Sequence, residues 1–296
     1  MQIHEFKTEK EWLDFRKQHV CASDMPIILG DAKWKLPDGR VKTPFLLWQE
    51  KLGLFDLSCD NVATRYGKSM EEPARQAYNA MIFDKMTPAV ITNKKYPNFM
   101  ASLDGLSVTR DRAVEIKNAN AHDHALAKEG KVPKKYYAQL QTQLLVTELP
   151  MIDYFSMHQG EGIIVPVERN DDYIELIKKK GNAFWELVLD LKEPEMTDDD
   201  YVERNDAWGV IAKGLWDIKE EIKGLEKEKK RLEQLLKEES FGCNSRHGNY
   251  RFTVVRAKGG IDYSSIPELE HVNLEKYRKP QITKWLLNFK NNLGEK

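Results

Sequence analysis

In the first third of the chain, apolar residues recur every three or four positions. Such spacing places them on one face of a helix. Ser, Thr or Asp stands near the start of several of these segments, and glycine ends two of them, as is typical of helix caps. We expect four helices, over residues 8–20, 22–30, 43–53 and 62–83, the last starting near Ser69 or one turn earlier.

The middle of the chain changes period. Val, Ile, Phe and Tyr gather in short runs separated by turn residues, which is typical of strands. We expect strands within 88–108, 112–119, 152–158 and 162–169, and helices over 132–148 and 170–193. Helices flanking a central sheet predict one α/β or α+β domain over residues 1–195.

The last third is organised differently. Residues 192–206 carry seven acids against two bases, and we interpret 196–206 as an acidic connector. From Trp208 to Leu236 apolar residues alternate at intervals of three and four, broken only by Lys229. This spacing predicts a long helix over 207–240, which either lies on its own domain or makes a coiled-coil contact with a second helix or subunit. A small C-terminal unit, 241–296, should hold a strand, a Gly259–Gly260 turn and a final helix.

Composition narrows the class of protein. The 296 residues are 41% hydrophobic, which is enough to fill a core, and no apolar run approaches the roughly 18 residues of a membrane helix. Without a signal-like start, the chain is expected to be cytoplasmic. Cys21, Cys59 and Cys243 are scattered, so we expect free thiols rather than a disulfide framework, a zinc site or the four-thiolate iron–sulfur cluster of a Cas4-like nuclease.

Candidate chemistry gathers around two of the strands. Asp104 precedes Gly105, where a turn is expected, and Glu115 and Lys117 lie two apart, so that both point to one face of a strand. A hairpin would bring the two carboxylates together, and their repulsion favours a hard cation such as Mg²⁺ or Mn²⁺. With a lysine beside it, such a site suits phosphodiester hydrolysis. The alternative is a solvated strand edge on which Glu115 and Lys117 pair with each other.

This spacing resembles that of the PD-(D/E)xK nuclease superfamily, with Leu103 in place of the usual proline. The chain also resembles the phage alkaline exonucleases of the lambda-exonuclease and YqaJ type. Four further stretches carry that resemblance, in family order: WLDFRKQHVCASD, YGKSMEEPAR, YYAQLQ and VPVERNDDYIELI. It implies a restriction-endonuclease-like core with a central mixed sheet flanked by helices. The helical extension and its small β element go beyond the compact lambda-type core.

The resemblance also implies roles for the residues of the cleavage site. Asp104 and Glu115 would bind metal together with the Ile116 carbonyl, and Lys117 would position the nucleophilic water. Glu71, or Glu72 if the register slips, would add a carboxylate directly or through water. Gln139, with Gln141 as the alternative, would orient the lysine, the water or the scissile phosphate.

For DNA, the resemblance assigns the 5′-phosphate to Arg16 and Ser23, and a guanidinium and a hydroxyl at a helix start suit that group. Trp34, Lys131, Lys134 and Lys135 are further candidates for gripping the backbone or stacking on a base, with plain solvated loops as the alternative. His122, Asp123 and His124 are read as a polar turn rather than a metal cluster.

The expected activity is a Mg²⁺-dependent 5′-to-3′ exonuclease on linear double-stranded DNA with a 5′-phosphate end, leaving 3′ overhangs for recombination; Mn²⁺ would substitute. The resemblance also implies a phage or prophage protein in the bacterial cytosol, a homo-oligomer (a ring trimer) and a single-strand annealing partner. Two alternatives stay open: an endonuclease of restriction or repair type, and a non-catalytic DNA-end-binding scaffold.

Overall fold

The computed structural model describes residues 1–36, 39–54, 62–255, 266–269 and 272, without the side chains of 62–66, 68 and 268. It divides into two compact units, Met1–Val202 and Glu203–Lys296, each of which is described by itself. Cys59, the Gly259–Gly260 turn and the expected C-terminal helix lie outside the described residues.

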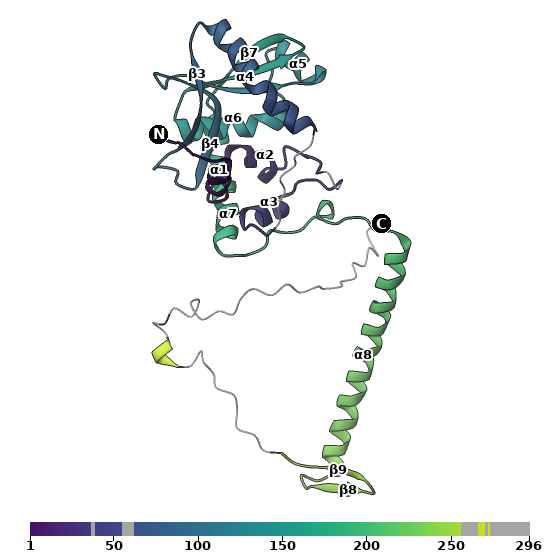
Figure 1. Cartoon of the computed structure of the whole chain (residues 1–296). Coiled ribbons are helices and arrows are strands. Elements are labelled where there is room, and N and C mark those ends of the chain that lie inside the picture. The colour runs from purple at the N-terminus through teal and green to yellow at the C-terminus, as the bar shows by residue number, and fades with distance from the viewer. Residues whose placement is uncertain (37–38, 55–61, 256–265, 270–271, 273–296) are drawn as a thin grey trace. The chain divides into compact units, whose positions relative to one another are not determined.

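The first unit is built on a seven-stranded mixed sheet (Figure 1). Its order is β1-β3-β4-β5-β6-β7, with β2 beside β4; β2 with β4 and β5 with β6 pair parallel, and the other pairs are antiparallel. The strands are β1 (Gln2–His4), β2 (Val20–Cys21), β3 (Met86–Thr92), β4 (Phe99–Ser107), β5 (Ala113–Asn118), β6 (Met151–His158) and β7 (Glu161–Glu168). The predicted central mixed sheet is confirmed.

Helices cover both faces of this sheet (Figure 1). They are α1 (Glu9–Lys17), α2 (Met25–Ile28), α3 (Pro44–Lys51), α4 (Val62–Ile82), α5 (Ala121–Lys128), α6 (Lys134–Thr147) and α7 (Asp171–Leu189), with short 3₁₀ turns at Ala22–Asp24 and Asp198–Asp200. The main core cluster joins α2, α3, α6 and α7 to one face, while a smaller cluster joins α4 to the other through Ala74 and Tyr78. The sheet is therefore buried between two helical layers, as the alternating pattern predicts.

A β-bulge interrupts β4 beside the expected site. Thr87 pairs with Leu106 and Ala89 with Leu103. Between these two pairs, β4 therefore advances by three residues and β3 by only two. The extra residue falls at Asp104–Gly105. A bulge breaks the alternation of side chains and re-aims those within it, which is why such irregularities occur beside functional sites. The expected turn at Asp104 is therefore wrong: this residue lies inside a strand, and β4 ends only at Ser107.

Gly105 is required by packing rather than by a turn. A Cβ placed on it would lie 2.7 Å from Val114 Cγ1 and 2.8 Å from Met86 Cβ, closer than carbon atoms approach. The neighbouring strands β3 and β5 thus close tightly around this point. Any larger residue here would push Asp104 out of place.

One further expectation needs correction. The polar turn expected at His122–His124 is the first turn of α5, which Asn120 caps by accepting from the Asp123 N–H.

The acidic stretch 196–206 contains the boundary between the two units. Asp200 is buried, accepts a hydrogen bond from the Thr43 hydroxyl at the start of α3, and so fixes this stretch on the first unit.

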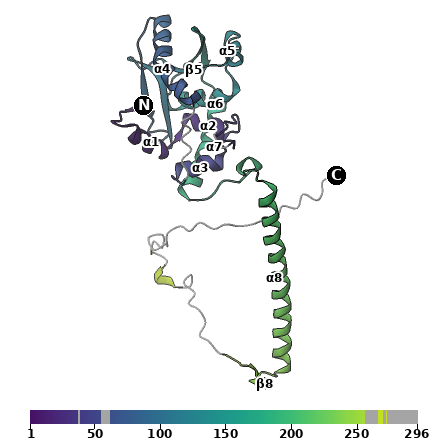
Figure 2. The same cartoon turned by 45° about the vertical axis from the view of Figure 1, so that its right-hand side comes forward.

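The second unit contains one long helix, α8 (Asp206–Glu239), and a short hairpin of β8 (Ser245–His247) and β9 (Tyr250–Phe252). Figure 2 shows α8 as one unbroken helix. Asn205 caps it by accepting from the Trp208 N–H. Among the described residues of the chain, no helix is long and apolar enough to cross a membrane.

Candidate active site

Asp104 and Glu115 lie on adjacent antiparallel strands. Gly105 pairs with Val114 in the ladder, so the next positions along the two strands are Asp104 and Glu115. In place of a further backbone ladder bond, the Ile116 N–H donates to Asp104 Oδ2 over 2.7 Å. The Asp104 carboxylate is thereby tied to the strand that carries Glu115.

The electrostatics of Asp104 reflect this crowding. Burial, and then the nearby Glu115 carboxylate, raise the pKa of Asp104 to about 8, and Glu71 adds to the rise; Lys117 and the Ile116 N–H oppose it. At neutral pH the ionised form of this carboxyl is therefore destabilised. A bound cation would remove that penalty.

Glu115 is only 2% exposed and is held by three side chains. Its Oε1 accepts from Lys117 Nζ at 2.5 Å and from Gln139 Nε2 at 2.6 Å, and its Oε2 accepts from Gln143 Nε2. A buried carboxylate without such donors would cost several kcal/mol or take up a proton. These donors fix the orientation of Glu115 before any ligand binds.

The three glutamines of α6 divide between its two sides. Gln139 and Gln143 are one helical turn apart and both reach Glu115. Gln141 points elsewhere: it donates to the Glu168 carbonyl and accepts from the Asn170 N–H, so it braces the start of α7. Sequence reasoning missed Gln143, although its i, i+4 spacing from Gln139 could have indicated it.

Lys117 is the cation of the site. Burial by itself would lower the pKa of Lys117, but the carboxylates of Glu115 and Asp104 outweigh it and raise the pKa above its usual value. Lys117 Nζ also lies 5.2 Å from the centroid of the Tyr136 ring, a cation–π distance. An ammonium held this firmly keeps its proton, so it can orient a water or an anion but is unsuited to act as a base.

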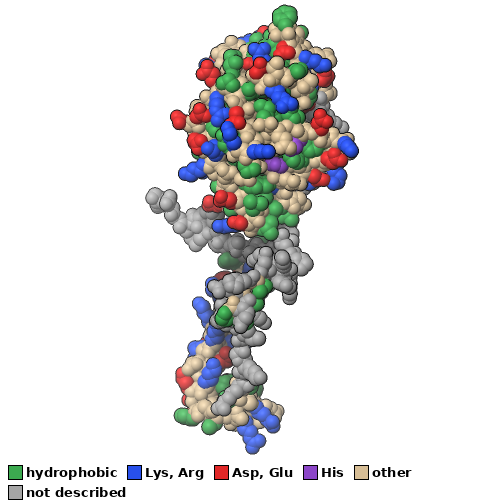
Figure 3. Space-filling model, turned by 90° about the vertical axis from the view of Figure 1, so that its left-hand side faces the viewer, with side chains coloured by type: hydrophobic (Ala, Val, Ile, Leu, Met, Phe, Trp, Pro, Cys, Tyr) green, Lys and Arg blue, Asp and Glu red, His purple; other side chains and the backbone are tan. Residues whose placement is uncertain are grey.

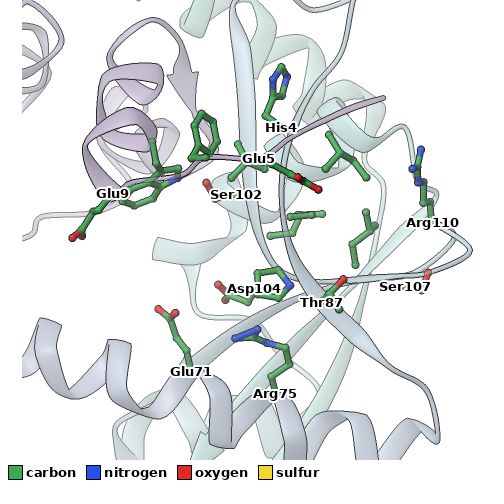
Figure 4. A pocket seen from close by; sticks show the side chains of 18 of the residues that line it. His4, Glu5, Glu9, Glu71, Arg75, Thr87, Ser102, Asp104, Ser107 and Arg110 are labelled. Atoms are coloured by element: carbon green, nitrogen blue, oxygen red, sulfur yellow. The ribbon is translucent and has the colours of Figure 1, made fainter.

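A cavity of about 1070 Å³ opens beside Asp104, between α4, β3 and the segment from β1 to α1. Figure 4 shows Glu71, Asp104 and Arg75 directed toward one another across it. Glu72 does not line this cavity; it pairs with Arg75 Nη2 at 3.3 Å and with Gln76 along the outer side of the helix. Of the two candidates, the geometry brings Glu71 to the site.

Arg75 also lies at this cavity, although the sequence predicted no role for it. Its side chain is 8% exposed, it lines the cavity, and its Nε has no hydrogen-bond partner in the structure. A buried guanidinium N–H without an acceptor is costly, so this group is suited to an anion that enters the cavity. The YGKSMEEPAR stretch contained it, but nothing in the sequence placed it beside Asp104.

The residues present fit a divalent metal ion. Asp104, Glu115 and Glu71 offer oxygen ligands alone, which is the set that Mg²⁺ and Mn²⁺ prefer, and their mutual repulsion shows in the raised pKa of Asp104. In the structure, the Ile116 N–H donates a hydrogen bond to Asp104 Oδ2, and Lys117 donates one to Glu115 Oε1. Over the described parts of the chain, no three His, Cys, Asp or Glu side chains are already gathered at metal-binding distance.

Arg16 and Ser23 lie together, as expected for residues that share a ligand. Arg16 Nη2 donates to Ser23 Oγ at 3.1 Å, and the guanidinium lies 4.8 Å from the Trp12 ring centroid. Beneath them Lys51 Nζ forms a buried ion pair with Asp24 at 2.6 Å and donates to the Arg16 carbonyl. Trp12 lines the cavity beside Asp104, whereas Arg16 and Ser23 do not.

The other proposed DNA contacts are not gathered in this way. Trp34 is half-buried and packs against the main core, which leaves less of its ring for stacking on a base. The three lysines pair with neighbouring carboxylates, Lys131 with Glu129, Lys134 with Asp31 and Lys135 with Asp123. Figure 3 shows acidic and basic side chains interspersed over the face of this unit that it draws.

His124 is buried and has a structural setting. Its Nδ1 lies 2.9 Å from Ser156 Oγ, and its ring lies 5.4 Å from that of His158. Asp123 is also buried, in its ion pair with Lys135. This part of α5 therefore packs against β6, where Ser156 is the strand partner of Lys117.

Comparison with solved structures identifies the fold. The crystal structure of the alkaline exonuclease LHK-Exo from Laribacter hongkongensis matches with a TM-score of 0.50 and 24% identity, covering 62% of this chain and 94% of that one. The complex of the same enzyme with dAMP matches with a TM-score of 0.52 over the same shares. The first unit thus has the alkaline exonuclease fold, which confirms the predicted fold class.

The sequence matches a family model. Residues 11–150 match the YqaJ-like viral recombinase domain, and this range includes every site residue from Trp12 to Gln143. The uncharacterized protein YqaJ of Bacillus subtilis (strain 168) is 27% identical over 253 residues, which cover 77% of each chain. Residues 11–150 are therefore similar to the YqaJ-like viral recombinase domain, which confirms the resemblance drawn from the motifs.

Proposed function

We propose that this protein is a metal-dependent exonuclease that degrades one strand of linear double-stranded DNA from a 5′-phosphorylated end and leaves a 3′ overhang for recombination. The observation that carries the proposal is the pair of adjacent carboxylates, half-buried Asp104 and buried Glu115, with Lys117 alongside. The recombinase family and the alkaline exonuclease fold support it. So does the dAMP bound to LHK-Exo, since a deoxynucleoside 5′-monophosphate is the product expected here.

Within this mechanism each residue has a task. Mg²⁺, with Mn²⁺ as a substitute, would be held by Asp104, Glu115 and the Ile116 carbonyl, with Glu71 directly or through water, and would supply an activated water and a Lewis acid for the phosphate. Gln139 and Gln143 keep Glu115 oriented. Lys117 holds the attacking water through its protons and offsets the negative charge that grows on the phosphate.

The end of the DNA would be recognised beside the cleavage site. Arg16 and Ser23 would bind the 5′-phosphate, for which a guanidinium provides paired donors and the hydroxyl a third. Arg75 would contact the phosphate that is being cleaved, since its side chain lines the cavity beside Asp104. A trimeric ring and an annealing partner would follow from the family but rest on no contact described here.

Digestion of a 5′-phosphorylated linear duplex beside a circular duplex, with Mg²⁺ or EDTA, tests this activity. We expect Mg²⁺-dependent loss of the linear form alone, with release of 5′-mononucleotides. Cutting of the circle would instead establish an endonuclease, and intact DNA in both lanes would establish a non-catalytic binding protein.

A second comparison tests the recognition of the end. Arg16→Gln should reduce the preference for a 5′-phosphate over a 5′-hydroxyl end by about tenfold or more, because charge-assisted bonds to the phosphate are lost. Lys10→Gln, on the exposed side of the same helix, is the matched control and should keep the preference. An unchanged preference in Arg16→Gln would remove Arg16 from the proposed site.

A further inference from the structure

The helix α8 exposes a continuous row of apolar side chains. None of its 34 residues is buried. Eight large apolar residues along it are between 47% and 71% exposed: Trp208, Ile211, Leu215, Ile218, Ile222, Leu225, Leu232 and Leu236. We call these eight residues the α8 seam. Leaving so much hydrocarbon in water costs free energy that a docked surface would recover.

The seam has the period of a coiled coil. Its intervals alternate between three and four from Trp208 to Leu236, with Lys229 at the one polar position, so seven residues complete two turns. A helix that lies on a globular core carries a wider apolar stripe with a period near 3.6. The α8 seam therefore fits a second helix better than the face of a domain.

Charge on α8 is segregated around the seam. The positions that flank it hold four acids and one base, in the order Ala212, Gly214, Lys219, Glu221, Glu226, Glu228, Glu233 and Leu235. The outward positions hold six bases and three acids: Lys213, Lys223, Lys227, Lys230, Arg231 and Lys237 against Asp217, Glu220 and Glu238. In a coiled coil, the flanking residues select the partner. We call the four flanking glutamates, Glu221, Glu226, Glu228 and Glu233, the acidic rim. Their negative charge favours a basic partner.

Two of the flanking glutamates have partners on α8 itself. Glu228 pairs with Arg231 at 2.7 Å and Glu233 with Lys229 at 3.8 Å. Exposed pairs of this kind contribute little and exchange readily with a better-placed partner. They leave the rim available to a basic helix.

A second copy of this chain fits the rim poorly. In a parallel pair, Glu221 would face Glu226 and Glu228 would face Glu233, so both contacts between two charged flanking residues would join two acids. An antiparallel pair centred on the seam would set Glu221 against Glu228 and gain only Lys219 with Glu226. Neither arrangement satisfies the rim.

We propose that α8 docks a helix of a different protein, one whose apolar residues repeat every seven positions and whose flanking positions carry Lys or Arg, with a carboxylate opposite Lys229. This inference is independent of the nuclease activity proposed above.

Fluorescent peptides of about five heptads test this on the full-length protein. Both probes carry Ile and Leu along the seam and Glu opposite Lys229; one has Lys and the other Glu opposite the four rim glutamates. By fluorescence anisotropy we expect the basic probe to bind about 50-fold or more tightly than the acidic one, and the difference to shrink in high salt.

A charge-reversed variant is the decisive control. Replacement of Glu221, Glu226, Glu228 and Glu233 by lysine keeps helix propensity and should invert the preference between the two probes, while digestion of linear DNA stays unchanged. Equal binding of both probes, or binding of neither, would overturn the proposal. A basic-probe complex that forms with residues 1–255 but not with the full-length protein would show that the chain's own end covers the seam, and would also overturn the proposal.

Self-association is measured separately by sedimentation of the full-length protein. The seam variant Ile218→Asp/Leu225→Asp should have the same mass as the wild type, because the proposal assigns α8 no role between copies. A lower mass for this variant would show that a second copy covers the seam, and would overturn the heterotypic partner without affecting the nuclease proposal.

Discussion

In the first unit charged side chains are buried, whereas in α8 large apolar side chains are exposed. Glu115 is 2% exposed, and Asp24 and Lys51 form a buried pair, while Leu225 is 62% exposed. Both features cost free energy in the isolated chain, since charge prefers water and hydrocarbon avoids it. In the first unit, hydrogen-bond donors and ion pairs within the protein lower the cost of burying charge. In α8, the cost of exposing hydrocarbon would be lowered only when a partner covers the seam.

This contrast separates two kinds of site. Around Glu115 the protein supplies Lys117, Gln139 and Gln143, so the site is oriented before any ligand arrives. The α8 seam has no such internal support and gains order from what it binds. Changes in the first unit should therefore alter catalysis and stability, and changes in α8 should alter association.

The largest effect is expected from Glu115→Gln. The shape is kept but the negative charge is lost, and with it a metal ligand and the partner of Lys117, so we expect the rate of linear DNA digestion to fall by about 10³-fold or more. DNA binding, measured by anisotropy in EDTA, should stay near that of the wild type. Activity within tenfold of the wild type would remove Glu115 from the mechanism.

Leu140→Ala probes the packing beneath the site. Leu140 is fully buried in the main core, next to Gln139 on α6, so the cavity left behind should lower the free energy of unfolding by about 2–5 kcal/mol. Urea unfolding followed by circular dichroism measures this. A loss under about 1 kcal/mol would mean that α6 repacks freely and does not hold its glutamines firmly.

The pH dependence of stability probes Asp104. Its pKa is about 8 in the folded chain and near 4 when unfolded, so the folded state binds the proton more tightly between these values. Without metal, stability should therefore fall as pH rises from 5 to 8, by up to about 1.4 kcal/mol per pH unit. Thermal unfolding in EDTA should show this slope in the wild type and not in Asp104→Asn.

Added Mg²⁺ extends the same experiment. At pH 8 it should raise the Tm of the wild type, because the cation offsets the repulsion between the carboxylates, and leave Asp104→Asn nearly unchanged. An equal rise in both proteins would place the bound cation elsewhere.

The smallest effect is expected from Leu225→Ala. Because the α8 seam is exposed and both residues favour helix, the free energy of unfolding should change by no more than about 0.5 kcal/mol, in contrast to Leu140→Ala. Binding of the basic probe should weaken all the same. A loss of stability of 2 kcal/mol or more would mean that the protein covers Leu225 itself, and the contrast between the two units would fail.

Much of the local structure could be predicted from the sequence because it depends on neighbouring residues. Apolar spacing and caps predicted helices over 43–53 and 62–83, close to α3 (Pro44–Lys51) and α4 (Val62–Ile82). The short strand β1 was missed, because three residues carry too little pattern and its place depends on pairing with β3. The motifs were sufficient to indicate the family and the residues to examine.

The sequence by itself determined which residue types the site contains, namely carboxylates, a lysine and amides, and the seven-residue repeat of α8. Only the tertiary structure decided which of them meet. Gln139, Gln141 and Gln143 are the same residue type, and the side of α6 that faces β5 selects two of them for Glu115. The bulge in β4 that re-aims Asp104 depends on its register with β3. Contacts between residues far apart in the chain are set by packing, which no local pattern encodes.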